Sequence, residues 1–418
     1  MTAIRECDAL VVGGGSAGIA AAVSAARAGA KVILIEKYGF LGGMATAGMV
    51  GTVCGLYLRG AAADKPEPVP GPFAHEWAER LGAASSTRPV DVAGAPPVLP
   101  FDVWAFQRLA DRIVAETPGL QTVLHATLTS AQREGDRVVA VEALVWDRKV
   151  VYRPRCVVDA TGCATATALA GGPVQEDGDR QCAAVVLSIE GVGDRFEAQA
   201  ARLSLLREVA RARHGGRLSP DCRAVSLVPA SSWRDRISLK IGLPPLEEGR
   251  PLDMTALEMK SRRGVEELWR FLVERAGCER CRLGRVATQV GVRVERRAKG
   301  RRVLTESDVL ECRKFPDGVA CGAWPIEEWG GEDRPRMASL PEGDWYEIPL
   351  DCLRVEGLEN VFVAGRCLSA TARAMASARV IATAMNTGWA AGLAAASQAL
   401  GGDESDAVKR LRPRQASP

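Results

Sequence analysis

Histidine is nearly absent from this chain of 418 residues, which contains only His75, His125 and His214. Candidates for a histidine acid or base are therefore scarce. His125 falls in an alternating stretch and is interpreted as a structural residue of a strand. His75 falls on a short predicted helix, where it is either a surface residue or a candidate acid or base that reaches a pocket.

Long apolar runs and a strong excess of one charge are also missing. The longest apolar run, at 390–396, is interrupted by Gly392 and is too short to cross ~30 Å of hydrocarbon. The 54 basic and 51 acidic residues are scattered and leave a net charge of +3, so nothing predicts binding to nucleic acid or a membrane span. With 47% hydrophobic and 25% charged residues, we expect a globular protein of about two to three domains that binds a small molecule.

Signals for export and for a metal site are lacking as well. The strand pattern begins by residue 8, which leaves no room for a signal peptide, so we expect a cytoplasmic protein. The 12 cysteines are then expected to be reduced thiols. Cys278 and Cys281 form a lone C-x-x-C without the further thiolates of a metal centre, so no metal is predicted.

The strongest pattern that is present lies at the N-terminus. A strand at 8–12 runs into a glycine turn at 13–18, followed by an alanine-rich helix. In this G-x-G-x-x-G spacing Gly13 makes the tight turn, Gly15 lets the backbone approach a diphosphate, and Gly18 allows close helix packing. Phosphates would face the free N–H groups of the helix start. The residues of the turn that we expect to bind a dinucleotide are Gly13, Gly15, Ser16, Ala17 and Gly18.

A second strand, at 31–36, ends in an acid. Glu36 lies 23 residues after Gly13, where a carboxylate accepts hydrogen bonds from adenosine ribose hydroxyls and disfavours a 2′-phosphate; Lys37 adjoins it. A glycine turn alone has a purely structural alternative, but the complete strand, turn, helix, strand and acid unit favours dinucleotide binding. The unit does not distinguish NAD from FAD.

Two later strands end in similar turns. Residues 155–162 end in Ala160, Thr161 and Gly162, and residues 360–366 end in Ala-Gly-Arg. With the N-terminal unit, these segments resemble the FAD-dependent oxidoreductases of the glutathione-reductase-like superfamily. The closest resemblance is to the family called FAD-dependent oxidoreductase, and it extends from residue 8 to about 396. The matching stretches are 36–51, 157–162, 289–310, 346–353 and 361–392.

The resemblance implies an α/β fold with a discontinuous, glutathione-reductase-like Rossmann FAD domain and an inserted α+β substrate or cap domain. The expected limits are 1–175 for the first part of the FAD domain, 176–334 for the cap, 335–401 for the second part and 402–418 for a disordered tail.

The loop at 41–48 is the first candidate for lining the flavin ring. Gly42 and Gly43 would let the backbone pass close to phosphate or flavin, and Thr46 could offer its hydroxyl to the ring; the alternative is a tight loop whose glycines serve only its dihedrals. Gly365 and Arg366 are expected near the diphosphate and ribityl chain. A helix from about 379 to 393 would point its N-terminus at the flavin carbonyl. The further cofactor-binding residues are therefore Glu36, Lys37, Gly42, Gly43, Met44, Ala45, Thr46, Ala160, Thr161, Gly162, Gly365 and Arg366.

Arginine is the main source of candidate substrate contacts, because only nine of the 54 basic residues are lysine. Arg293 and Arg379 fall in family-matching segments, and a guanidinium suits a carboxylate substrate or the flavin phosphates; surface ion pairs are the alternative. Family members often have a histidine in the stretch matching 371–373, where this chain has Ala372, so a mechanism that uses that histidine does not transfer. The candidate catalytic residues are Arg293, Arg379, Thr46 and His75.

The expected function is transfer of a hydride between bound FAD and a small organic substrate held between the two domains, and a carboxylate is one candidate for that substrate. Because only one dinucleotide fingerprint is found, the electron partner is a transient NAD(P)H, oxygen or quinone. No dithiol follows the first helix, which disfavours disulfide reduction. The alternatives are a flavin-dependent monooxygenase, a flavin subunit of an electron-transfer complex, or a flavoprotein that uses FAD as a scaffold. A homo-oligomer is possible.

Overall fold

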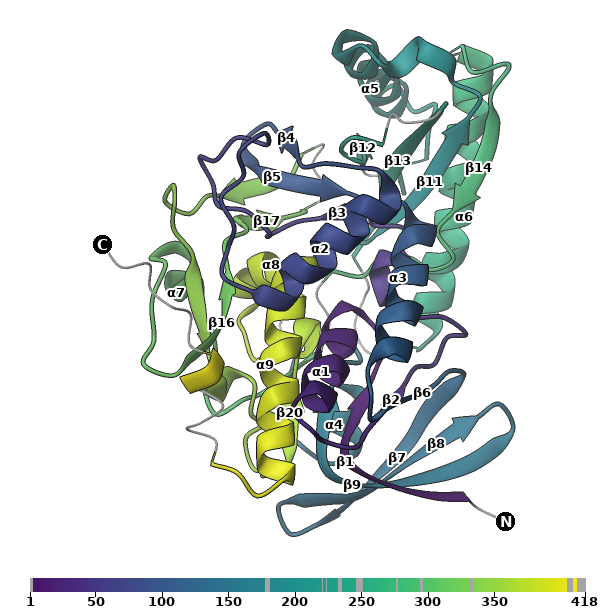
Figure 1. Cartoon of the computed structure of the whole chain (residues 1–418). Helices are drawn as coiled ribbons and strands as arrows, with labels where there is room; N and C mark the ends of the chain where they lie inside the picture. The colour runs from purple at the N-terminus through teal and green to yellow at the C-terminus, as the bar shows by residue number, and fades with distance from the viewer. Residues whose placement is uncertain are drawn as a thin grey trace.

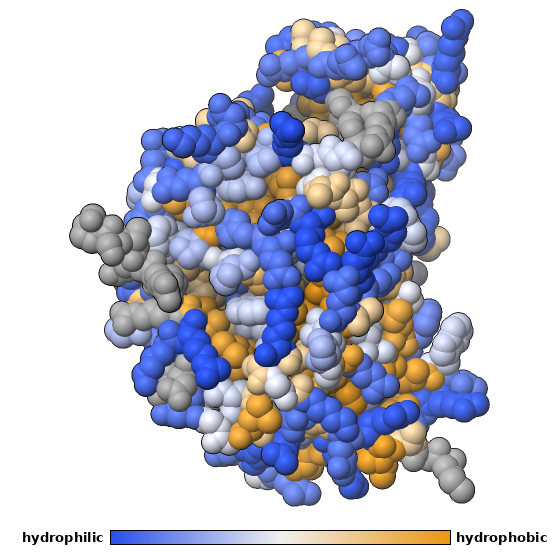
Figure 2. All heavy atoms as spheres, viewed as in Figure 1, coloured by the Kyte–Doolittle hydropathy of each residue, from blue (hydrophilic) through white to orange (hydrophobic). Residues whose placement is uncertain are grey.

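A computed structural model describes residues 3–176, 181–219, 221–222, 224–231, 235–245, 251–275, 277–293, 296–330, 334–403 and 409–411. The predicted tail at 402–418 lies largely outside these residues, although Leu411 packs against the core. None of the helices in the described ranges is both long and apolar enough to cross a bilayer. Hydrophilic side chains cover most of the face shown in Figure 2.

A seven-stranded sheet forms the centre of the larger unit (Figure 1). Its parallel part has the order β6, β2, β1, β9, β20, and the β7–β8 hairpin adds to the first half of β9 in antiparallel fashion. That hairpin turns at Gly135. The strands are β1 (Ala3–Val12), β2 (Val32–Ile35), β6 (Leu120–Val123), β7 (Ala126–Glu134), β8 (Arg137–Val145), β9 (Arg148–Asp159) and β20 (Val361–Val363).

The parallel strands end in register. Val12 pairs with Ile35 and with Asp159, and Asp159 pairs with Val363. Because parallel strands share a carboxyl edge, the segments that follow β1, β2, β9 and β20 come together there. In open α/β sheets this edge is where ligands bind.

Helices cover one face of the sheet, and α1 and α9 lie side by side on it (Figure 1). They pack almost backbone to backbone: a Cβ added to Gly388 of α9 would lie 2.1 Å from the Ala17 carbonyl oxygen of α1. Gly392 approaches Ala21 in the same way. The helices of this face are α1 (Ser16–Arg27), α2 (Pro72–Ser85), α3 (Val103–Glu116) and α9 (Ile381–Ala399); α4 (Thr165–Leu169) contacts the sheet at β7 and β9.

Gly388→Ala is therefore expected to destabilise the protein, although alanine is the better helix former by about 1 kcal/mol. The clash with the Ala17 carbonyl outweighs that gain, and we expect a net loss of about 1–3 kcal/mol. Urea unfolding measures it. Gly330→Ala is the control, because Gly330 is exposed and a Cβ added there would meet no atom within 4 Å. Equal stability of the two variants would contradict this packing.

A second unit carries its own core. Its four-stranded antiparallel sheet has the order β12, β13, β11, β14, and one face packs against two helices at the upper right of Figure 1. On β13, Ile237, Leu239 and Ile241 point into that core. Its elements are β11 (Ala184–Glu190), α5 (Gln199–His214), β12 (Ala224–Leu227), β13 (Arg236–Gly242), α6 (Pro251–Arg275) and β14 (Arg282–Val286).

The division of the core bears on the domain limits. The described members of the second core run from Ala183 to Val292, whereas Leu304 and several buried residues up to Leu353 belong to the core of the large sheet. We infer that the inserted unit ends near residue 293, earlier than the predicted 334. The remaining elements are β3 (Thr52–Val53), β4 (Val90–Val92), β5 (Ala95–Pro100), β10 (Val174–Gln175), β15 (Arg297–Ala298), α7 (Glu306–Leu310), β16 (Gly318–Gly322), β17 (Ile326–Glu328), β18 (Arg336–Ala338), β19 (Tyr346–Pro349) and α8 (Ala372–Ala378).

The observed architecture confirms the predicted fold class, an α/β Rossmann sheet with an inserted α+β unit. One local expectation was wrong: His125 is not within a strand but in the turn between β6 and β7, with φ 54°. Its ring lies against that of Trp146, with the centroids 4.6 Å apart and the planes tilted by 36°, and it packs against Gly39.

Candidate functional site

The glycine turn after β1 contains two close contacts and one open position. A Cβ at Gly13 would lie 2.5 Å from the Ala160 carbonyl oxygen, and one at Gly18 would lie 1.7 Å from the Gly13 oxygen. At Gly15 the only neighbour within 4 Å would be the Gly43 Cα, at 3.9 Å. Gly15 therefore borders free space, as a diphosphate cradle requires.

The start of α1 faces the same space. Gly15 is its N-cap, and no side chain caps its first N–H groups. Ser16 is half-buried, while Ala17 and Gly18 are buried in the first turn. Free N–H groups and the helix dipole suit a phosphate at this end.

The second glycine loop packs directly on the first. The Gly42 N–H donates to the Gly14 carbonyl at 2.8 Å, and a Cβ at Gly43 would lie 2.9 Å from the Gly15 Cα. Gly42 and Gly43 also have positive φ values, 108° and 54°, which favour glycine. Met44 and Ala45 follow in a short 3₁₀ turn. This loop therefore lines the open position at Gly15.

Thr46 has a local role in that loop. Its hydroxyl lies 3.0 Å from the carbonyl oxygens of both Leu41 and Gly43. A hydroxyl has a single proton to donate, so this proton is used within the turn. The structure thus gives Thr46 a part in shaping this glycine loop.

Glu36 at the end of β2 is buried and keeps its carboxylate at the turn. Its two oxygens accept the N–H groups of Gly14, at 2.6 Å, and Tyr38, at 2.9 Å. Burial raises the pKa of Glu36, although these hydrogen bonds oppose the shift. Each oxygen keeps a second lone pair that could accept a ribose hydroxyl. The Lys37 ammonium lies over the Tyr38 ring, 5.0 Å from its centroid.

The turns after β9 and β20 complete the edge. The Ala160 N–H donates to the Val12 carbonyl, which brings the Thr161–Gly162 turn against Gly13. Gly365 has φ 61° and packs on Ala17. The Arg366 guanidinium lies beside Gly162 and donates to the carbonyl of Val292 in the inserted unit. All of the predicted cofactor segments are therefore neighbours at one sheet edge, and their open glycine cradle fits a dinucleotide.

The last helix differs from its predicted limits. It begins at Ile381 and continues to Ala399, and α8 forms a separate helix before it. Val380 is the N-cap of α9 and no side chain caps it. The N–H of Ala382 in its first turn donates to the Cys54 carbonyl at 3.2 Å, so the chain itself occupies part of the positive end of the helix dipole. Arg379 lies in the break between α8 and α9.

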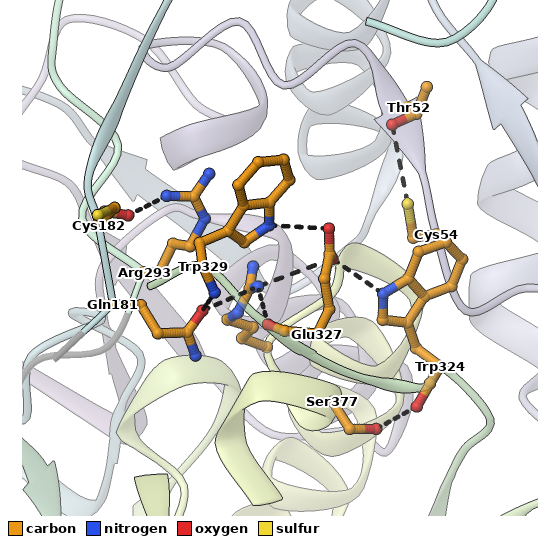
Figure 3. Close-up of polar contacts among 10 residues, drawn as sticks. Thr52, Cys54, Gln181, Cys182, Arg293, Trp324, Glu327, Trp329 and Ser377 are labelled. Atoms are coloured by element: carbon orange, nitrogen blue, oxygen red, sulfur yellow. Dashed lines mark hydrogen bonds and ion pairs between the residues drawn. The ribbon is translucent and has the colours of Figure 1, made fainter. Parts of the chain in front are cut away.

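A compact polar cluster forms around Glu327 (Figure 3). The Glu327 carboxylate accepts the indole N–H groups of Trp324, at 3.1 Å, and Trp329, at 2.9 Å. Arg379 Nη2 lies 3.7 Å from that carboxylate and donates to the Glu327 backbone carbonyl at 3.1 Å. Gln181 Oε1 is 3.5 Å from the same Nη2. Glu327 is thus the counter-ion that orients Arg379.

Two more cations converge on Trp329. The Arg293 guanidinium lies 4.9 Å from the indole centroid and also donates to the Cys182 carbonyl. The Lys240 ammonium lies 4.1 Å from the same centroid. The side chains of the cluster therefore come from four parts of the chain: β13 of the inserted unit, the segment that precedes β15, strand β17 with the residues beside it, and the break between α8 and α9. It brings together Arg293 and Arg379, the two arginines singled out from the sequence.

The charges of this cluster do not balance among the described residues, because Glu327 faces three cations. Burial alone would raise the pKa of Glu327, but Arg379, Lys240 and Arg293 outweigh it and hold the pKa below its usual value. Burial, followed by repulsion from Arg293, lowers the pKa of Lys240 from 10.5 to about 8. Burial and Arg379 likewise lower the pKa of Arg293. An anion would relieve this repulsion.

The cluster lies where the two units meet. The Gln289 N–H and the Thr288 hydroxyl, from the segment that leads to Arg293, both approach the Ala47 carbonyl of the flavin loop, at 3.2 and 3.3 Å. On β13, Arg236, Ser238 and Lys240 share the face opposite the core. A cavity of about 50 Å³ separates this face from residues 49–51 and 100–103. The polar face of the inserted sheet therefore looks toward the flavin loop.

The other candidate residues have structural contacts. His75 Nε2 is 2.7 Å from the Val69 carbonyl oxygen; because a carbonyl only accepts, this nitrogen carries the proton and is not a free base. Ala372, at the position of the family histidine, is a buried first residue of α8. Within the described residues, no three His, Cys, Asp or Glu side chains are grouped to hold a metal ion.

Sequence reasoning missed Lys240, Glu327, Trp324 and Trp329. The stretch 324–329 begins and ends with tryptophan and contains acids between them, which was a usable signal in a chain with only 5% aromatic residues. Lys240 gave a weaker one, as a lysine in an alternating strand. Their convergence depends on tertiary structure, so neither signal alone pointed to the other.

Comparison with known proteins gives one match over nearly the whole chain: residues 8–414 match the family described as FAD dependent oxidoreductase. No curated protein matches. Among solved structures, a geranylgeranyl bacteriochlorophyll reductase-like protein from Thermoplasma acidophilum is 13% identical, with 98% of this chain and 82% of that chain covered and a TM-score of 0.48. The flavin-dependent brominase Bmp2 is 14% identical, with 98% and 83% covered and a TM-score of 0.49.

The p-nitrophenol 4-monooxygenase PnpA from Pseudomonas putida is 13% identical, with 98% and 84% covered and a TM-score of 0.49. At these identities and TM-scores the structural likeness carries no argument about function. The family match does, because it spans the glycine turn, the flavin loop and α9 together. The chain therefore belongs to the FAD-dependent oxidoreductase family: it is an enzyme, and its cofactor is FAD.

Proposed function

We propose that this enzyme moves a hydride between FAD and a small acidic organic substrate held between the large sheet and the inserted unit. The observation that supports this most strongly is a cluster of three cations with one carboxylate: Arg379 lies beside Glu327, and Arg293 and Lys240 lie against the ring of Trp329, whose indole N–H binds Glu327. A substrate anion would balance charges that the described residues leave unbalanced. When bound, FAD supplies the two-electron acceptor or donor.

Each part of the chain has a role in this proposal. The turn at Gly13–Gly18 and the start of α1 hold the diphosphate, Glu36 binds the ribose, and the loop with Gly42 and Gly43 lies along the cofactor. Met44, Ala45, Ala160, Thr161, Gly162, Gly365 and Arg366 line the same edge. The start of α9 favours negative charge on the flavin side of the cluster.

Arg293 and Arg379 orient the substrate rather than exchange protons with it, because a guanidinium stays charged. Trp324 and Trp329 are both buried, and their indoles exclude water around the acid that orients Arg379. A low-dielectric setting strengthens each of these charge contacts. A transient NAD(P)H, oxygen or quinone would complete the electron balance.

The test is an anaerobic screen of small acids, amines and alcohols against the flavin absorbance. We expect at least one carboxylic acid to bleach the flavin, and its methyl ester to do so more slowly by about 10- to 100-fold, as loss of a charged contact predicts. Bleaching by neutral alcohols or amines with no preference for acids would contradict an acidic substrate. Oxygen incorporated into a product under aerobic conditions with NAD(P)H would indicate a monooxygenase instead.

A further inference from the structure

Lys240 has an unusual environment for a lysine. Its ammonium lies on the Trp329 indole, and the residue is only partly exposed. Within the described part of the chain no carboxylate oxygen lies within 4 Å of this ammonium, and no hydrogen bond from it is found. A lysine that leaves water normally gains a carboxylate or carbonyl in exchange. Lys240 has left water in part without gaining such a partner among the described residues.

The charged and titratable groups that face Lys240 come from several elements. Two cations repel the Lys240 ammonium: Arg293, from the segment before β15, and Arg379, from the break between α8 and α9. Two groups can attract it: the Glu327 carboxylate of β17 and the Cys54 thiol after β3. Glu327 is already bound by two indole N–H groups and by Arg379. Burial raises the pKa of Cys54 to about 12, so this thiol is neutral near pH 7. Lys240 and Arg293 therefore share no free counter-ion among these groups.

We propose that Lys240 and Arg293, which both lie against the indole of Trp329, form a subsite that binds one carboxylate group of the substrate. The ammonium offers three donors and the guanidinium a planar fork, and one carboxylate can accept from both. This subsite deepens the proposed function and rests on it: Arg379, already paired with Glu327, would be a positioning residue.

The location of Lys240 supports a role in substrate recognition. It shares the polar face of β13 with Ser238, which borders the cavity between the two units. The opposite face of the same strand packs into the core of the inserted unit, which fixes the backbone that carries Lys240. A cation on a rigid strand keeps its position when the ligand is absent, and preorganisation of this kind strengthens binding.

Binding should depend on pH in a characteristic way. The lowered pKa of Lys240, about 8 in the free protein, must rise when an anion binds beside it. Affinity for a carboxylate is then constant below pH 8 and falls by about tenfold for each pH unit above 8, until the bound form also loses its proton.

The experiment is isothermal titration of the FAD-loaded protein with acetate, using acetamide as a neutral probe of the same shape. We expect acetate to bind at pH 7, about tenfold more weakly at pH 9, and acetamide not to bind detectably. Lys240→Gln should lose about 10- to 100-fold in acetate affinity at pH 7. Lys240→Arg should bind acetate nearly as well as wild type at pH 7 and show no weakening at pH 9.

Wild-type acetate affinity in Lys240→Gln, or an affinity that is flat from pH 7 to 9 in the wild type, would overturn the subsite. Retention of FAD and a cooperative thermal transition identify folded variants, and Lys240→Arg tests the proposal by its pH profile even if Lys240→Gln unfolds. The result also separates this inference from the proposed function. Acetate binding with the expected pH profile, in a protein whose flavin no acid bleaches, supports the subsite and contradicts the redox role.

Discussion

A Gly15→Val protein is expected to fold but to bind FAD about 10- to 100-fold more weakly than the wild type, and to be purified nearly colourless. The free protein tolerates the change, because the first added carbon would meet only the Gly43 Cα at 3.9 Å. The remaining methyl groups would occupy the space that the backbone leaves for the diphosphate. This is the largest functional effect that we expect from a single substitution.

The measurement is the ratio of flavin absorbance to protein absorbance after purification, followed by titration with FAD. Wild-type protein stripped of FAD is the matched control, since the variant should have the same melting temperature as that form. A variant that keeps a full complement of flavin would contradict the position of the cofactor against the first turn of α1.

Substitutions in the charge cluster should have opposite effects on stability. Glu327→Gln removes the one carboxylate that faces Lys240, Arg293 and Arg379, and we expect a loss of about 3–5 kcal/mol, as for other buried ion pairs that lose one partner. Lys240→Met removes an uncompensated cation and keeps the apolar stem on Trp329, so we expect a gain of about 1–3 kcal/mol. A residue that lowers stability while it serves binding is common at functional sites.

The pH dependence of the Lys240→Met effect follows from the sign of the shift. The pKa of Lys240 is about 8 in the folded protein and near 10.5 in the unfolded chain, so the cost of its buried charge is complete below pH 8. Between pH 8 and 10.5 the unfolded chain binds more protons, and the cost disappears as pH rises. The stability gained by Lys240→Met should therefore be full at pH 7 and much smaller at pH 10.

Denaturant unfolding of the FAD-loaded variants at pH 7 and pH 10 tests both effects. The double variant should be more stable than the sum of the two single changes in the free energy of unfolding predicts, by about 0.5–3 kcal/mol. The reason is that Glu327→Gln costs less stability once the Lys240 cation has been removed. If Lys240→Met destabilises the protein at pH 7 as much as Glu327→Gln does, the cluster holds no uncompensated charge.

The cofactor edge could be foreseen from the sequence because its information is local. Three of its strands can be recognised as short apolar runs that are followed by a glycine turn, at Gly13, Gly162 and Gly365. Parallel pairing then brings these ends together without further detail. Positions that need a positive φ or a close approach can hardly use another residue.

The charge cluster around Glu327 and Trp329 could be foreseen only in part. Arg293 and Arg379 were found because they lie in family-matching segments, but their partners come from distant parts of the chain. A single lysine on β13 and an acid on β17 have no spacing that relates them. Contacts of this kind depend on how the inserted unit sits on the large sheet.

The break before α9 shows how tertiary contacts override local sequence. The stretch from 372 to 392 contains no proline, and its alanines favour a continuous helix. In the structure Val380 is extended and packs against Val98 and Trp324, while Arg379 turns toward Glu327. The gain from burying Val380 and pairing Arg379 exceeds the cost of interrupting the helix.

The central claim is that an anion site and the flavin belong to one active site, and titration of the yellow protein with acetate tests it most directly. We expect a saturable change in the visible flavin spectrum at pH 7, with the same midpoint as the binding heat. The midpoint should be raised about 10- to 100-fold in Lys240→Gln, and the change should be absent with acetamide. Acetate that binds with measurable heat but leaves the flavin spectrum unchanged would place the anion away from the ring and contradict the account.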